Sequence, residues 1–80
     1  MSLTKEALEF HIVLAVTQVV ETLSTDMKMS PEDALRFFMK TKTFDELQDK
    51  KSKLFLESHG YVMDMLGAEL RGDWESWLTY

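Results

Sequence analysis

The chain has 80 residues, a formal net charge of −5 and no cysteine. This length suits one domain with a modest core, so we expect a single domain over residues 1–80. The lack of cysteine excludes a disulfide framework and thiolate metal sites. Apolar residues at 45% and charged residues at 29% are ordinary for a folded globular protein and argue against disorder.

The most apolar segment, residues 10–20, argues against a membrane protein. It is interrupted by His11, Thr17 and Gln18, and it is only about half as long as the roughly 20 residues that cross a bilayer. Residues 1–9 also lack the charge pattern and cleavage site of a signal peptide. The sequence therefore predicts a cytoplasmic protein without a membrane partner.

The first predicted helix spans about residues 4–23. Its apolar residues recur at three- and four-residue spacing, as Leu8, Ile12, Ala15, Val16, Val19 and Leu23. Phe10, Val13 and Val20 widen this stripe, and Leu14 falls inside the remaining polar strip. A helix that is apolar around most of its circumference belongs at a centre. It is either wrapped by the other helices of its own chain or shared with a second copy.

Two shorter helices follow, over about 31–40 and 44–49. Ser30 suits the N-cap of the first, and Pro31 suits its first helical position. Thr43 and Glu46 have the spacing of a capping box for the second. The side chains expected to face inward are Ala34, Leu35, Phe38, Met39, Phe44 and Leu47.

The last main helix is predicted over about 59–71, after a short apolar piece at 54–56 that is either helical or extended. Ser58 is its candidate N-cap, and Gly72 suits the residue just past its end. One side of this helix carries Tyr61, Val62, Met65, Leu66 and Leu70, and the other carries Gly60, Asp64, Gly67 and Arg71. Asp73 can then cap a short aromatic turn. The sequence thus predicts an all-α fold, a compact bundle of four main helices plus this C-terminal turn.

The case for an enzyme is thin. The chain has two histidines, and a group of Glu57, His59 and Asp64 matches no metal-ligand spacing. The three glycines form no phosphate-binding loop. We expect no catalytic residue, no metal site and no cofactor.

A DNA-binding regulator or antitoxin-like protein is the alternative function. Residues 31–51 have the proportions of a helix-turn-helix segment, with Arg36, Lys40 and Lys42 nearby. However, the second helix of that segment carries Asp45, Glu46 and Asp49, which repel phosphates. The acidic balance of the chain therefore argues against nucleic acid as the partner.

The favoured function is protein binding, as a homodimer formed through the first or the last main helix. Tryptophan and tyrosine are enriched at interface centres, and glycine on a helix face permits close approach of another chain. The predicted interaction residues are Leu14, Gly60, Gly67, Trp74, Trp77, Leu78 and Tyr80. Two alternatives stay open for the C-terminal residues: they pack on the core of their own chain or on the surface of a partner.

Residues 30–49 (SPEDALRFFMKTKTFDELQD) and 54–70 (LFLESHGYVMDMLGAEL) carry a resemblance. The order of a capped helix, an aromatic-rich helix and a leucine-rich closing helix resembles a group of small bacterial all-helical proteins of unknown function. The resemblance covers roughly residues 8–70 and is one of pattern. It implies a bacterial, cytoplasmic protein and names no site residue.

Overall fold

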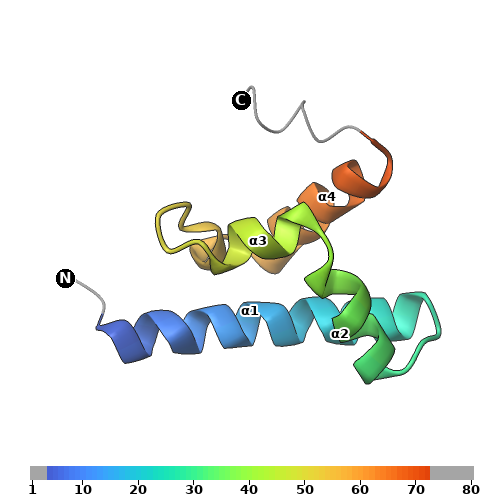
Figure 1. The fold of residues 1–80 in the computed structure, drawn as a ribbon, viewed down its shortest axis with the longest axis horizontal. Coiled ribbons are helices and arrows are strands. Elements are labelled where there is room, and N and C mark those ends of the chain that lie inside the picture. Colours follow the sequence, from blue (N-terminus) through green and yellow to red (C-terminus); the bar gives the residue numbers. More distant parts are fainter. Residues whose placement is uncertain (1–3, 73–80) are drawn as a thin grey trace.

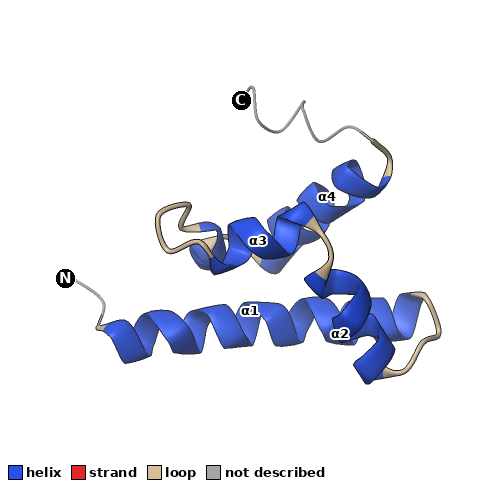
Figure 2. Ribbon diagram, in the orientation of Figure 1, coloured by secondary structure: helices blue, strands red, loops and turns tan. Residues whose placement is uncertain are grey.

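The computed structural model describes residues 4–72, which form helices joined by short loops and contain no strand. The elements are α1 (Lys5–Asp26), α2 (Pro31–Met39), α3 (Lys42–Gln48), the 3₁₀ helix η1 (Leu54–Leu56) and α4 (His59–Leu70). Figure 2 shows this all-helical composition, which confirms that the fold is all-α. The predicted turn containing Trp74, Trp77 and Leu78 lies outside the described residues.

The helices differ greatly in length, and this sets the shape of the fold. Figure 1 shows α1 along the long axis of the molecule, with α2 crossing it near its C-terminal end. The chain then turns back through α3 and returns through α4, and both helices contact each other and α1. The first turns of α1 extend past the ends of the other helices (Figure 1).

Side-chain caps fix the starts of the helices. The hydroxyls of Ser30 and Ser58 accept hydrogen bonds from the backbone N–H groups of Asp33 and Tyr61, at 3.1 and 3.2 Å. These caps were predicted, and both are confirmed, as is Pro31 in the first turn of α2. Gly72 has a φ of 84° just past the end of α4, a conformation that glycine adopts without strain.

The predicted capping box of α3 is wrong. Thr41 caps this helix, accepting from the N–H of Phe44, so the helix begins two residues earlier than expected. Thr43 lies inside the helix and is buried, and both its backbone N–H and its hydroxyl donate to the carboxylate of Glu69 at 2.8 Å. The same carboxylate accepts from the N–H of Lys42. The Glu69 side chain of α4 thus accepts hydrogen bonds from the first N–H groups of α3, and no local sequence rule predicts that contact.

The core lies where α1, α2, α3, η1 and α4 meet. Its buried apolar residues are Val19, Leu23, Ala34, Phe38, Leu47, Leu54, Phe55, Val62, Met65 and Leu66. Phe38 also meets Phe44 edge-on, with ring centroids 5.3 Å apart. Edge-to-face contact stabilises a pair of aromatic rings in addition to the stabilisation that comes from burying them.

Four residues of the predicted inner stripes lie outside the core. Leu35 and Met39 of α2, and Tyr61 and Leu70 of α4, are exposed. The physical reason is that each short helix packs along one narrow face, so fewer apolar positions are covered than the periodicity offers. The predicted bounds of α1 were also short, because the helix runs three residues further, to Asp26.

Candidate interaction surface

The outer face of α1 carries three large apolar side chains that are exposed. Phe10, Val13 and Leu14 are 64%, 62% and 44% exposed, and Thr17 lies exposed beside them. Their spacing places these four side chains on one stripe of the helix, which we call the α1 outer face. Glu6 and Glu21, both exposed, lie at its two ends.

This face is open because α1 is too long for its neighbours. It has 22 residues, whereas α2, α3 and α4 have 9, 7 and 12. At 1.5 Å per residue α1 is about 33 Å long, and the others cover only one side of it. Only 11% of its most apolar 18-residue window is buried. The helix was predicted to be central, and the other helices of residues 4–72 do not wrap it.

A large apolar groove runs along one side of the α1 outer face. Its volume is about 530 Å³, and its walls come from α1, α2 and α3. The lining residues are Ile12, Val13, Val16, Thr17, Val20, Glu21, Pro31, Leu35, Phe44 and Gln48. Leu35, which was expected in the core, instead forms part of this wall.

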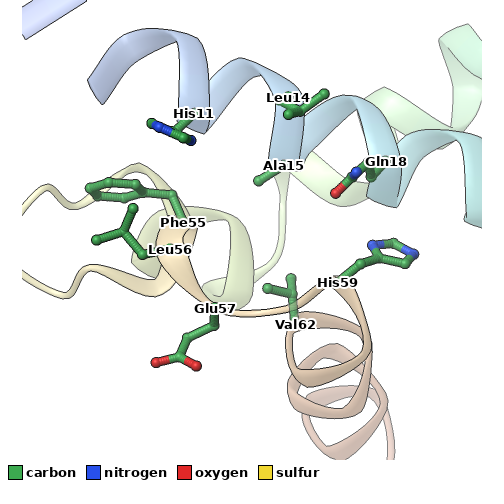
Figure 3. Close-up of a pocket in the computed structure, with 9 residues that line it drawn as sticks. All are labelled: His11, Leu14, Ala15, Gln18, Phe55, Leu56, Glu57, His59 and Val62. Carbon is green, nitrogen blue, oxygen red and sulfur yellow. The ribbon is translucent and has the colours of Figure 1, made fainter. Parts of the chain in front are cut away.

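A smaller groove of about 230 Å³ runs along the other side of α1. Figure 3 shows its lining, with His11, Leu14, Ala15 and Gln18 from α1 facing Phe55 and Leu56 of η1, Glu57, and His59 and Val62 of α4. Leu14, a predicted interaction residue, thus lies on the α1 outer face and at the edge of this groove. The α1 outer face is therefore a ridge between two hollows.

Both histidines line the smaller groove, one at each end (Figure 3), which the sequence analysis did not foresee. The hydrogen bond described for His59 joins its Nε2 to the hydroxyl of Thr22, at 2.9 Å. The side chain of Glu57 points away from the ring of His59 (Figure 3), and Asp64 is exposed one turn later. The group of Glu57, His59 and Asp64 is thus not assembled as a site. Within residues 4–72 no three acidic or histidine side chains gather in a way that could hold a metal.

The predicted interaction glycines lie on α4. A Cβ at Gly60 would meet nothing within 4 Å, whereas a Cβ at Gly67 would lie 3.1 Å from the guanidinium of Arg71 on the same helix. Neither glycine is needed for close packing between helices of this chain. The remaining predicted residues, Trp74, Trp77, Leu78 and Tyr80, lie outside the described residues.

Two groups of the segment proposed to read DNA already have partners within the chain. The N–H groups that open α3 already donate to Glu69, so they are not available to a phosphate. On α2, Arg36 pairs with Glu32 at 2.9 Å and approaches Asp33 at 3.8 Å. These contacts favour a fixed, mixed-charge surface over a phosphate-binding one.

α1 also meets the length and composition of a helix that could cross a membrane, with a mean hydropathy of 1.3 over its most apolar 18-residue window. The sequence-based expectation considered only residues 10–20, and the helix is twice as long. Core helices of soluble proteins meet the same criteria, and Val19 and Leu23 of α1 are buried in the core.

Sequence periodicity could not reveal the two grooves. Each is built from three elements, and residues such as Pro31 and Phe44 line the larger one only because α2 and α3 fold back on α1. The available signal was the excess apolar arc of α1, and Phe10 and Val13 were noted as widening that arc. They were not placed among the interaction residues, although the structure leaves them the most exposed of its large apolar side chains.

Comparison with models of known families, with curated proteins and with solved structures finds no match for this chain. The resemblance to small bacterial all-helical proteins stays a prediction.

Proposed function

We propose that this chain is a small, non-enzymatic protein-interaction module of the cytoplasm that acts as a homodimer through the α1 outer face. The observation that carries the proposal is the exposure of Phe10, Val13 and Leu14 on one helix stripe. An apolar ridge between two hollows, all on one small domain, is typical of an interaction site.

A second copy of the chain is the simplest partner for this surface. A two-fold interface uses the same patch on both subunits, so the patch must be complementary to itself. A ridge flanked by grooves meets that condition, because the ridge of each copy can enter a groove of the other. In such a dimer the two α1 helices form the centre of a bundle whose outer helices come from both chains.

Sedimentation at low micromolar concentration tests the proposal. The wild-type chain should sediment as a dimer with twice the 9.3 kDa mass of the monomer. Phe10→Asp should give a folded monomer, because it places a charge at the centre of the contact while changing a side chain that is exposed in the isolated domain. Helical content by circular dichroism confirms that the variant folds.

Leu70→Asp provides the matched comparison, because Leu70 is also exposed but lies at the end of α4. It should leave the dimer intact. A dimer that survives Phe10→Asp and is lost in Leu70→Asp would place the interface on the last helix, and a wild-type monomer would refute self-association. Binding of the wild-type monomer to lipid vesicles would instead indicate that α1 faces a membrane.

DNA binding through residues 31–51 is the alternative, and the contacts of Glu69 with the start of α3 count against it. A gel-shift assay at low salt tests it directly. Tight, salt-sensitive binding would overturn the preference for a protein partner.

A further inference from the structure

The α1 outer face has the same spacing of residues when it is followed from either end, with a glutamate at each end. Glu6 and Glu21 are equally far from the midpoint between Val13 and Leu14, and so are Phe10 and Thr17. If two α1 helices pair in antiparallel fashion about that midpoint, Val13 meets the Leu14 of the other copy and Phe10 meets its Thr17. A parallel pair instead places each residue against its own equivalent.

The position of the larger groove distinguishes these two arrangements. On α1 its lining runs from Ile12 to Glu21, so the groove lies on the C-terminal side of Phe10. In a parallel pair the Phe10 of each copy stays level with the other Phe10, away from the groove. In the antiparallel pair each Phe10 lies opposite Thr17 of the other copy, over the middle of the groove.

The groove is also chemically suited to a phenylalanine side chain. Its apolar walls around Thr17 come from Val13, Val16, Val20 and Leu35. Its volume of about 530 Å³ is large enough for an aromatic ring and the side chains next to that ring. Phe10 is the most exposed large apolar side chain among residues 4–72. The most exposed of these side chains thus meets an apolar groove of about 530 Å³ that can bury it.

The placement of α2 favours the same arrangement. α2 crosses α1 near its C-terminal end, and the first turns of α1 extend past the other helices (Figure 1). Antiparallel pairing brings the α2 of one copy toward the first turns of the other α1. Parallel pairing leaves the first turns of both copies without that neighbour.

We propose that two copies of this chain associate through antiparallel α1 helices, with the Phe10 of each copy seated in the groove beside Thr17 and Leu35 of the other. This inference rests on the proposed homodimer and adds its geometry. It also places Glu6 of each copy opposite Glu21 of the other, where like charges oppose association and salt relieves the repulsion.

Thiol crosslinking tests the geometry cleanly, because the chain has no cysteine of its own. Glu6→Cys and Glu21→Cys alter only the exposed ends of the stripe and leave its apolar centre intact. In the antiparallel pair the two Glu6 positions are separated by about 22 Å along the helix axes, since Glu6 lies level with Glu21 fifteen residues away. A short bifunctional thiol reagent spans much less than this.

We expect no crosslink in Glu6→Cys alone or in Glu21→Cys alone, and a covalent dimer when the two variants are mixed. Crosslinking of Glu6→Cys alone would show a parallel pair, and a failure of both single variants and of the mixture to crosslink would exclude α1 as the paired element. Either result overturns the geometry while leaving self-association intact, provided that the wild-type chain sediments as a dimer. A wild-type monomer refutes the homodimer itself.

Discussion

The two faces of α1 have similar residues and opposite surroundings. The inner face buries Val19 and Leu23 completely or nearly so, whereas the outer face leaves Phe10 and Val13 more than half exposed. Both faces belong to one continuous helix from Lys5 to Asp26. The difference shows that the amount of apolar surface on a helix does not tell which part stabilises the monomer. The part of α1 that stabilises the monomer is the part that the shorter helices cover.

The largest predicted effect comes from the inner face. Leu23→Ala removes a side chain that is 4% exposed, and such core truncations cost about 2–5 kcal/mol in the free energy of unfolding. This is a large share of the roughly 5–15 kcal/mol that stabilises a small domain. Chemical denaturation at a protein concentration low enough to favour the monomer should measure the loss.

Leu14→Ala is the matched change on the outer face of the same helix. It should cost the monomer under about 1 kcal/mol, because the side chain is already 44% exposed. Its effect should appear in the dissociation constant of the dimer. Equal losses of monomer stability in the two variants would contradict the division of α1 into a folding face and a binding face.

Phe10→Asp should have the next largest effect, and it should act on association alone. Loss of a ring from the centre of an interface together with an introduced charge typically costs about 2–4 kcal/mol of binding energy. At about 1.4 kcal/mol per tenfold change, the dimer should be at least about thirtyfold weaker by sedimentation equilibrium. A dimer of unchanged strength would remove Phe10 from the interface.

Glu69→Ala should weaken folding and leave association unchanged. Its carboxylate accepts hydrogen bonds from the backbone N–H groups of Lys42 and Thr43 and from the Thr43 hydroxyl. Loss of a charged acceptor that leaves donors unpaired costs about 1–3 kcal/mol. Thermal melts should show a lower Tm, and the dissociation constant of the folded dimer should stay as in the wild type. A shift in association would mean that the contact between α3 and α4 belongs to the interface.

The smallest predicted effect separates the two ways of pairing α1. In an antiparallel pair, Glu6→Lys converts two repulsive contacts with Glu21 into attractive ones, which should tighten the dimer about fivefold at low salt. Raising the salt concentration should reduce that gain. In a parallel pair Glu6 faces the Glu6 of the other copy. Glu6→Lys then replaces a repulsive pair of glutamates with a repulsive pair of lysines and does not tighten the dimer. Sedimentation equilibrium at two salt concentrations distinguishes these results.

Local signals predicted much of the fold. Serine caps at positions 30 and 58, Pro31 and the apolar periodicity located the main helices, because these features act within a few residues of chain. The start of α3 was misplaced because Thr43 was taken as its N-cap. Thr43 instead lies inside the helix, where its N–H donates to Glu69, 26 residues later in the chain. Leu35 and Met39 were expected inside because periodicity gives the direction of an apolar face and not whether another helix covers it.

The candidate surface was predicted only in outline. The broad apolar arc of α1 indicated a helix shared with something else, and Leu14 was selected because it interrupts the polar strip. The grooves on either side depend on how α2, α3 and η1 fold back on α1. Those contacts join distant parts of the chain, so no short stretch of sequence contains them.

Sedimentation of the wild-type chain across a range of concentrations is the most direct test of the division between the two faces of α1. The proposed homodimer predicts a reversible increase from 9.3 kDa to twice that mass at low micromolar concentration, abolished by Phe10→Asp and unaffected by Leu70→Asp. A mass of 9.3 kDa at every concentration would contradict it, because the outer face of α1 would then remain in water.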